Sequence, residues 1–171
     1  MTKQGKTVLI IAIVGACCVA GVTLILILSA IAIPGVQAQK LKGNEVAALN
    51  ALRDINIEEQ LYNSTYPQHG FACSLSALGG SRQSGPATPE AAQLIEPDLA
   101  SGHKYGYTFT ISNCLKVTIK GQDMVISYKL TAVPDMGDKS GERGYCANEN
   151  MDIRFDPKGG TNCEELLPFV P

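Results

Sequence analysis

An apolar run near the N-terminus limits what this chain can fold into more than any other feature. Between Val8 and Ile33 every residue is apolar or small, and Gly, Thr and Ser are the only interruptions. As a helix the run would be roughly 39 Å long, and a bilayer core requires roughly 20 such residues. A soluble helix would show a polar stripe, which is missing here. We therefore predict a transmembrane helix over residues 8–34, preceded by a cytoplasmic stub of residues 1–7.

The charges around this run predict its orientation. Lys3 and Lys6 are the only basic residues before Lys40, and no acidic residue precedes Glu45. Basic residues on the N-terminal side favour a cytoplasmic N-terminus, so the rest of the chain would be exported. The positions expected to pack within the membrane are Ile13, Gly21, Leu24, Leu28, Ile31 and Pro34.

Two other kinds of processing compete with a permanent or N-terminally trimmed anchor. A secretory signal that ends within "VQAQ" would use Val36 and Ala38 as the small residues before the cut, but the apolar run is about twice as long as the usual h-region. A lipoprotein-like site at Cys17 fits the local letters "IVGAC", but apolar residues follow where a polar tether is expected. With an anchor, Cys17 and Cys18 are small residues embedded in the membrane.

The chain beyond Pro34 changes to an amphipathic pattern. Pro34 does not have to end the helix, because proline commonly kinks a membrane helix. Turn-forming residues in "NSTYP" then predict the helix end before Asn63. We expect an amphipathic continuation over residues 35–64 and an exported head over residues 65–171. The apolar stripe recurs at helical spacing, with Glu59 as its one polar break: Val46, Leu49, Leu52, Ile55 and Tyr62.

Alternation of apolar and polar residues predicts the strands of the head. The segments "YGYTFTIS", "LKVTIK" and "MVISYKLTA" alternate, and "MDIRF" provides a last short strand. The side chains expected on the buried face are Tyr105, Tyr107, Phe109, Ile111, Leu115, Val117, Ile119, Met124, Ile126, Tyr128, Leu130, Met151, Ile153 and Phe155. Such half-buried alternation is typical of an antiparallel meander.

A short helix is also predicted over "TPEAAQLI", with Thr88 as N-cap and Pro89 at the first helical position. The helix stripe needs a partner, and the apolar sheet face supplies one. The expected fold class is α+β, with one long N-terminal helix packed on a small antiparallel sheet.

Four cysteines lie outside the apolar run: Cys73, Cys114, Cys146 and Cys163. An even number in an exported domain implies disulfides, and three connectivities are possible. We favour Cys73–Cys114, which would tie the end of the helix region to the sheet, and Cys146–Cys163, which would pin the C-terminal tail. A zinc site is the competing use, but it lacks the C-x2-C spacing, and only His69 and His103 could assist.

Composition and motifs argue against several classes of function. The chain has 14 basic and 16 acidic residues, and without Lys3 and Lys6 the part from Lys40 onward carries a net charge of −4. Without a basic cluster or any Trp, we expect no nucleic-acid partner. The histidines have no neighbouring nucleophile motif, and the "EE" pair at Glu58 and Glu59 is interpreted as a solvated helix face. The oxygen-rich loop "DMGDKSGER" lacks regular calcium-ligand spacing. We expect no enzyme activity, cofactor, metal or small-molecule substrate.

Several segments resemble type IV pilins and type II secretion pseudopilins. The segment "AIAIPGVQAQKLKGNEVAALNALRDINIEEQLYNSTYP" is similar to their first helix, in which "AIAIP" closes the transmembrane half. The segments "YPQHGFACSLSALGG" and "GERGYCANENMDIRFDPKGGTNC" resemble one group of short, disulfide-bonded members. The resemblance covers roughly residues 30–163 and implies the pilin fold.

The N-terminus departs from that family. With "AIAIP" held in register, the cleavage glycine of a prepilin falls at Ala12, the first mature residue at Ile13 and the family's glutamate at Cys17. The string "GVTLIL" from Gly21 resembles the motif out of register, but cutting there leaves too few apolar residues to span a bilayer. The glutamate is thought to pair with the N-terminal amine of a neighbouring subunit, because a charge in that apolar core requires a partner.

The resemblance implies a structural subunit of a pilus or secretion filament. It would sit in the inner membrane as a single-pass protein with a periplasmic or extracellular head, and its N-terminal helix would pack with other pilin or pseudopilin subunits. Because the processing motif is degraded, an accessory member is favoured over a major pilin. The alternative is a stand-alone binding domain, membrane-tethered or secreted, that uses a pilin-like fold.

Overall fold

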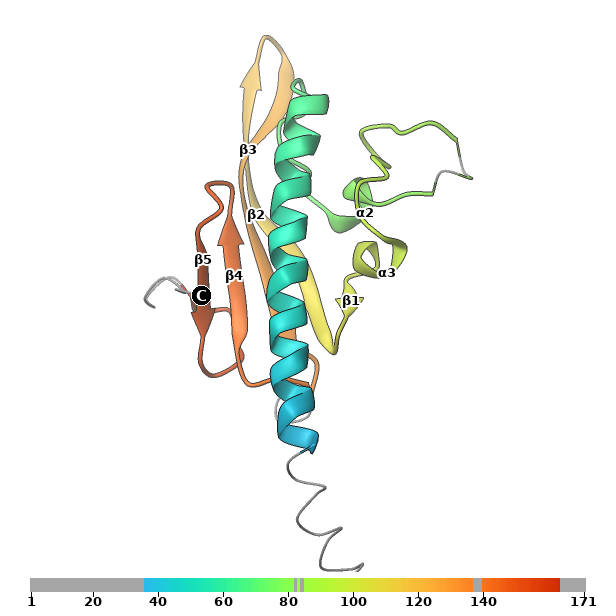
Figure 1. Ribbon diagram of the computed structural model, residues 1–171. Helices are drawn as coiled ribbons and strands as arrows, with labels where there is room; N and C mark the ends of the chain where they lie inside the picture. The colour runs from blue at the N-terminus through green and yellow to red at the C-terminus, as the bar shows by residue number, and fades with distance from the viewer. Residues whose placement is uncertain (1–35, 82, 84, 137–139, 164–171) are drawn as a thin grey trace, which may run out of the picture. The chain divides into compact units, whose positions relative to one another are not determined.

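The computed structural model describes residues 36–81, 83, 85–136 and 140–163 (Figure 1). The chain divides into two compact units, Met1–Lys40 and Leu41–Pro171, and the fold given below is that of the second. The apolar run and its six packing positions from Ile13 to Pro34 lie outside the described residues. Among the residues that are described, none of the helices combines the length and the apolar character needed to cross a membrane.

One long helix is described over residues 36–65. Leu49, Leu52, Ile55 and Tyr62 of the predicted stripe are buried, as the helical spacing requires. Val46 was placed on this stripe wrongly, since 60% of it is exposed. At that level of the helix the buried residue on the packed face is Ala48. Glu45, next to Val46 in the chain, accepts a hydrogen bond from the N–H of Glu142.

The helix ends at residue 65 instead of before Asn63. The hydroxyls of Ser64 and Thr65 both donate to the carbonyl oxygen of Leu61, at 2.8 Å. The prediction counts Ser64 among the turn-forming residues, but a hydroxyl that bonds back to the preceding turn lets Ser64 and Thr65 stay within the last helical turn.

A five-stranded antiparallel sheet lies against this helix. Its order follows the chain, as in a meander, so the α+β prediction is confirmed. The strands are β1 (His103–Lys104), β2 (Tyr107–Ile119), β3 (Gln122–Pro134), β4 (Gly144–Asn148) and β5 (Ile153–Asp156).

Three strands differ from the alternation-based prediction. The segments "YGYTFTIS" and "LKVTIK" were expected as separate strands but form the single strand β2, and Tyr105 lies before it, 46% exposed. β4 was not predicted, because its residues from Gly144 to Ala147 are all buried and show no alternation. Met151 was placed in the last strand, but it lies in the turn before β5 with a φ of 63°.

Two bulges explain why the predicted faces fail along the β2–β3 hairpin. Ser112 pairs with Lys129, but the next pair is Leu115 with Ser127, so β2 holds one extra residue. Lys116 then pairs with Val125, so β3 holds an extra residue at Ile126 and the register is restored. Each slip of one residue exchanges the two faces of the strand beyond it.

The exchange moves apolar side chains away from the core. Leu115, Ile119 and Ile126 were predicted to face inward, but their exposed fractions are 56%, 50% and 41%, respectively. Val125 takes the buried position instead of Ile126. Gly70, with a φ of 74°, lies against it so closely that a Cβ would sit 2.0 Å from the Val125 carbonyl oxygen.

The predicted helix over "TPEAAQLI" does not form. Residues Ala92, Gln93 and Leu94 instead donate their N–H groups to carbonyls of the short helix α2 (Leu75–Leu78) and the glycine that follows it. The carbonyl of Pro89 accepts a hydrogen bond from the hydroxyl of Tyr62 at 2.8 Å. Tertiary hydrogen bonds therefore override the local capping pattern. A second short helix, α3 (Pro97–Ala100), leads to β1.

The core lies between the long helix and the facing side of the sheet. Its largest fully buried apolar members are Tyr107, Tyr128, Tyr145, Leu52, Ile55, Leu78 and Leu130.

Candidate functional site

Two disulfides cross-link the described part of the chain. Cys73 is bonded to Cys114 and Cys146 to Cys163, with Cα atoms 6.0 Å apart in each pair. The two pairings favoured from position in the sequence are confirmed. They also exclude a zinc site that uses these thiols.

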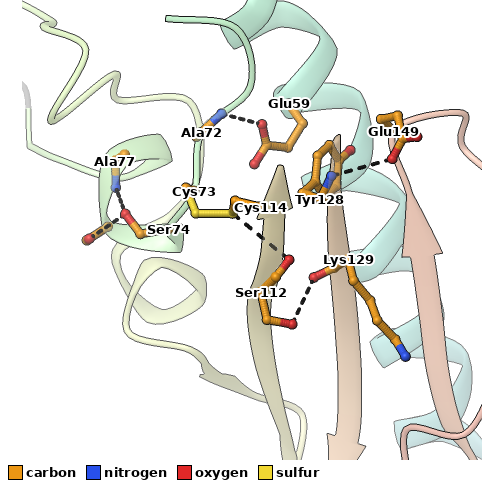
Figure 2. The surroundings of a disulfide bond; sticks show 11 residues. Glu59, Ala72, Cys73, Ser74, Ala77, Ser112, Cys114, Tyr128, Lys129 and Glu149 are labelled. Atoms are coloured by element: carbon orange, nitrogen blue, oxygen red, sulfur yellow. Dashed lines mark hydrogen bonds between the residues drawn. A yellow bond between two sulfur atoms is a disulfide. The ribbon is translucent and has the colours of Figure 1, made fainter. Parts of the chain in front are cut away.

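Each disulfide fixes a segment that the sheet alone does not hold. Cys73 lies in the loop after the long helix and Cys114 at the β2 bulge, so the first bond joins this loop to the sheet (Figure 2). The second joins β4 to the segment after β5. Disulfides of this kind persist in oxidising compartments, which indicates an extracytoplasmic location for the head.

A carboxyl group is buried between the long helix and the sheet. Glu59 was interpreted as part of a solvated face, but it has no exposed surface. Its Oε2 accepts the backbone N–H of Ala72 at 2.8 Å (Figure 2). Burial is the larger of two opposing effects and raises the pKa of Glu59 to about 8, whereas the hydrogen bond from the Ala72 N–H favours the charged form and lowers the pKa. The side chain is therefore mainly neutral at pH 7.

Two buried partners share this part of the core. The hydroxyl of Tyr128 donates to Oδ1 of Asn56, one helical turn before Glu59. Nδ2 of Asn56 and Oε1 of Glu59 are buried without a hydrogen-bond partner among the described residues. Burial keeps the pKa of Tyr128 above its usual range, and so do the negative charges that Glu59 and Glu149 carry at the high pH where a tyrosine ionises. The side chains of Asn56, Glu59 and Tyr128 form a buried polar seam inside the core.

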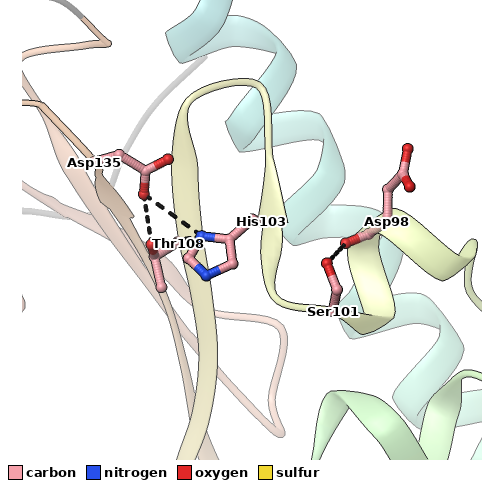
Figure 3. A network of polar contacts seen from close by, with 5 residues as sticks. All are labelled: Asp98, Ser101, His103, Thr108 and Asp135. Carbon is pink, nitrogen blue, oxygen red and sulfur yellow. Dashed lines mark hydrogen bonds and ion pairs between the residues drawn. The ribbon is translucent and has the colours of Figure 1, made fainter.

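A second polar cluster lies on the surface beside β1 and β2. The hydroxyl of Thr108 donates to Oδ1 of Asp135 at 2.5 Å. Nδ1 of His103 is 3.1 Å from the same hydroxyl and 3.8 Å from the Asp135 carboxylate (Figure 3). β1 places the histidine opposite Thr108, and Asp135 follows the end of β3.

This cluster does not have the geometry of a nucleophilic triad. In a triad one imidazole nitrogen faces the hydroxyl while the other faces the carboxylate. Here Nδ1 faces both groups, and the hydroxyl proton is given to Asp135 instead of to the histidine. The side chain of His103 is also 65% exposed, so the site does not exclude water. The arrangement stabilises the β1–β2 turn and the end of β3.

Side chains near the start of the head attach the long helix to the loop between β3 and β4. Oε1 of Glu45 accepts the N–H groups of Glu142 and Arg143, at 2.8 and 3.2 Å. Asn44 donates to the Ser140 carbonyl at 3.0 Å. The sequence offered no local signal for these contacts, because they join residues almost a hundred positions apart.

Open hollows lie on the described surface of the head. One of about 420 Å³ lies over β3, β4 and the Cys146–Cys163 bond, and one of about 430 Å³ lies between the long helix and residues 94–105. Their lysines are already engaged: Lys129 donates to the Thr161 carbonyl at 3.1 Å, and Lys104 bonds to Glu96. The first hollow is lined largely by polar side chains, namely Asn113, Ser127, Lys129, Asn148, Glu149, Asp152 and Arg154.

No group of three or more histidine, cysteine or acidic side chains suited to a metal ion occurs within the described ranges. The loop read as a possible calcium site includes residues 137–139, which lie outside those ranges.

Comparison with protein-family models, with curated proteins and with solved structures finds no match to this chain. The pilin-like character of the protein therefore lies in its architecture, a long N-terminal helix on a five-stranded antiparallel sheet.

Proposed function

We propose that this chain is a membrane-anchored, pilin-like subunit of a pilus or secretion filament system. One observation carries the proposal: an amphipathic helix, described from residue 36 directly after the apolar run of the sequence, covers one face of a disulfide-bonded antiparallel meander. The sequence order of the apolar run, the helix and the sheet fits an exported head that follows a membrane anchor.

In this role the apolar segment lies in the inner membrane with a cytoplasmic N-terminus, and it packs against the equivalent helices of other pilin or pseudopilin subunits. The chain acts by association and has no chemistry of its own. Support for this comes from the surface cluster at His103, whose hydrogen bonds are arranged to hold a turn.

Intact-mass measurement of the mature protein from fractionated cells, with N-terminal sequencing, tests how the anchor is processed. A chain trimmed near Ile13 or Val22 with a methylated amine would support ordinary filament assembly. A full-length chain in the inner membrane would support an accessory member that is never polymerised.

Crosslinking tests whether the anchor meets other subunits. We expect a photo-crosslinking residue at Leu24 or Leu28 to give adducts with other pilin-like proteins in the membrane. The same residue at Lys158, exposed on the head, serves as the control for non-specific adducts. If the Leu24 and Leu28 variants give no adducts beyond those of the control, the proposal is wrong.

A stand-alone binding domain is the second candidate, favoured by the lack of a prepilin cleavage motif and of the family's glutamate, whose place is taken by Cys17. A soluble mature form that begins at Gln39 would favour this candidate over the filament subunit.

A further inference from the structure

The β2–β3 hairpin extends beyond the rest of the sheet (Figure 1). On the outer edge of β2, β1 pairs only with Tyr107 and Thr108. On the outer edge of β3, Lys129 is the residue nearest the hairpin tip that pairs with β4. Within the described ranges, β2 therefore has no partner strand on its outer edge from Thr110 to its end at Ile119.

The hydrogen bonds of Val125 show which backbone groups point out from this edge. Val125 donates its N–H to the carbonyl of His69 and accepts from the N–H of Phe71, both at 2.9 Å. Its backbone groups therefore point away from β2, which makes Val125 and Lys116 a non-hydrogen-bonded pair. By the alternation of the ladder, the N–H and C=O groups of Lys116 and Thr118 point outward from the free edge.

The side chains along this edge divide by face. Tyr128 points into the core, so Ser127 and its cross-strand partner Leu115 lie on the opposite face. Val117 and Ile119 follow Leu115 at period two and share that face. More than half of Leu115 and half of Ile119 is exposed. An apolar row therefore lies along the outer face, while Lys116 and Thr118 lie on the other.

The charge of this edge is positive. β2 contains no acidic residue, and its one charged side chain is Lys116. Lys120 follows in the turn, where positive φ angles at Lys120 and Gly121 form a tight two-residue hairpin turn. The nearest carboxylate on β3, Asp123, accepts a hydrogen bond from the Thr118 hydroxyl at 2.6 Å.

We propose that the outer edge of β2 around Lys116 and Thr118 is a strand-addition site for an extended segment of a partner protein. In that segment apolar residues alternate with Asp or Glu. Its backbone would bond to the outward groups of Lys116 and Thr118, and its apolar side chains would extend the row from Leu115 to Ile119. Its acidic side chains fall on the face of Lys116 and meet the positive charge. This inference goes beyond the proposed function and does not require the chain to enter a filament.

Fluorescence anisotropy with the full chain in detergent micelles tests the proposal. The probe is a labelled Val-Glu-Val-Glu-Val-Glu-Val peptide. The controls are Val-Lys-Val-Lys-Val-Lys-Val and a peptide with the composition of the probe in blocks, Glu-Glu-Glu-Val-Val-Val-Val. We expect the probe to bind at least about tenfold more tightly than either control, since only it matches both the register and the charge.

Two variants at Thr118 separate the backbone from the side chain. Thr118→Pro removes the outward N–H as well as the hydroxyl bonded to Asp123, and proline is compatible with an edge strand, so we expect binding of the probe to weaken by about tenfold. Thr118→Ala loses the hydrogen bond to Asp123 but keeps the N–H, so we expect it to bind like the wild type. Thermal unfolding of each variant verifies that the fold is kept.

Reversal of the charge gives a test that does not depend on proline. Lys116 is exposed, so Lys116→Glu should leave the fold intact. We expect this variant to bind the lysine peptide more tightly, relative to the glutamate probe, than the wild type does. Equal binding of all three peptides, or equal effects of Thr118→Pro and Thr118→Ala, would overturn the proposal. It would also be overturned if the chain self-associates through this edge, with Thr118→Pro abolishing the dimer while the probe does not bind.

Discussion

Glu59 is the residue whose burial has the clearest consequence for the behaviour of the protein. It lies on the packed face of the helix, has no exposed surface and accepts one hydrogen bond, from Ala72. A carboxylate in such a place is costly unless it is paired, so the protein holds this group as a neutral acid. The cost of ionising it is therefore linked to the stability of the contact between helix and sheet.

We predict that stability falls with rising pH because of Glu59. The unfolded pKa is near 4.5 and the folded pKa is about 8. Between these values the folded state binds more protons, so the free energy of unfolding decreases as pH rises, by roughly 2–5 kcal/mol across the interval. Urea unfolding at a series of pH values measures the slope. Glu59→Gln retains an acceptor for the Ala72 N–H, and we expect it to flatten the dependence of the unfolding free energy on pH. Glu142 is exposed, and we expect Glu142→Gln to leave this dependence unchanged. An unchanged slope in Glu59→Gln would contradict the assignment.

At the scale of the helices and strands, the bulge in β2 has the largest effect on the outer face of the sheet. It lies at Asn113, whose φ is 51°, in the left-handed region. Asparagine tolerates this region better than most residues, and a β-branched residue tolerates it poorly. The bulge also brings Cys114 to the point where it meets Cys73. Backbone conformation, disulfide and register are therefore coupled in one short segment.

Substitutions at Asn113 test this coupling. We predict that Asn113→Val lowers the free energy of unfolding by roughly 1–2 kcal/mol, because it places a β-branched residue at positive φ. Asn113→Gly is expected to change stability little. Thr110→Val, at a regular and exposed position of the same strand, is the matched control and is expected to stay within about 0.5 kcal/mol. The midpoints of urea unfolding provide the comparison. Equal losses in Asn113→Val and Asn113→Gly would show that the side chain matters and not the φ angle.

At the scale of the whole molecule, two disulfides hold segments that have few strand partners. The Cys73–Cys114 bond spans 41 residues and fixes the loop between the helix and β1. The Cys146–Cys163 bond spans 17 residues and fixes the segment after β5. A cross-link that closes a longer loop removes more freedom from the unfolded chain.

We predict that the two disulfides contribute unequally. Cys73→Ala with Cys114→Ala should cost roughly 4 kcal/mol, and Cys146→Ala with Cys163→Ala roughly 3 kcal/mol. Denaturant unfolding of the two double variants measures the difference, and each variant is the comparison for the other. A larger loss from the Cys146 and Cys163 pair would mean that packing of these buried sulfurs outweighs the loop-closure effect.

Much of the architecture could be predicted from local pattern. Helical spacing placed Leu49, Leu52, Ile55 and Tyr62 on one buried face, and alternation placed Tyr107 and Phe109 on another. Cysteine positions were sufficient to favour both disulfides. These features depend on the period of the helix or strand and on composition, which short windows of sequence contain.

The tertiary structure decided the rest, and above all the candidate surfaces. Whether Glu59 is solvated or buried depends on Ala72 and the sheet that cover it. The paired bulges exposed Leu115 and Ile126, because strand register is set by pairing between residues far apart along β2 and β3. The segment after Thr88 lost its predicted helix to hydrogen bonds with α2. The sequence by itself was sufficient to predict the long helix with its apolar stripe, the antiparallel strands that alternate, and the favoured pairing of the cysteines. Only the folded chain decided which strand faces are buried beyond the bulges and whether Glu59 is covered, because register and burial there depend on contacts that no local window contains.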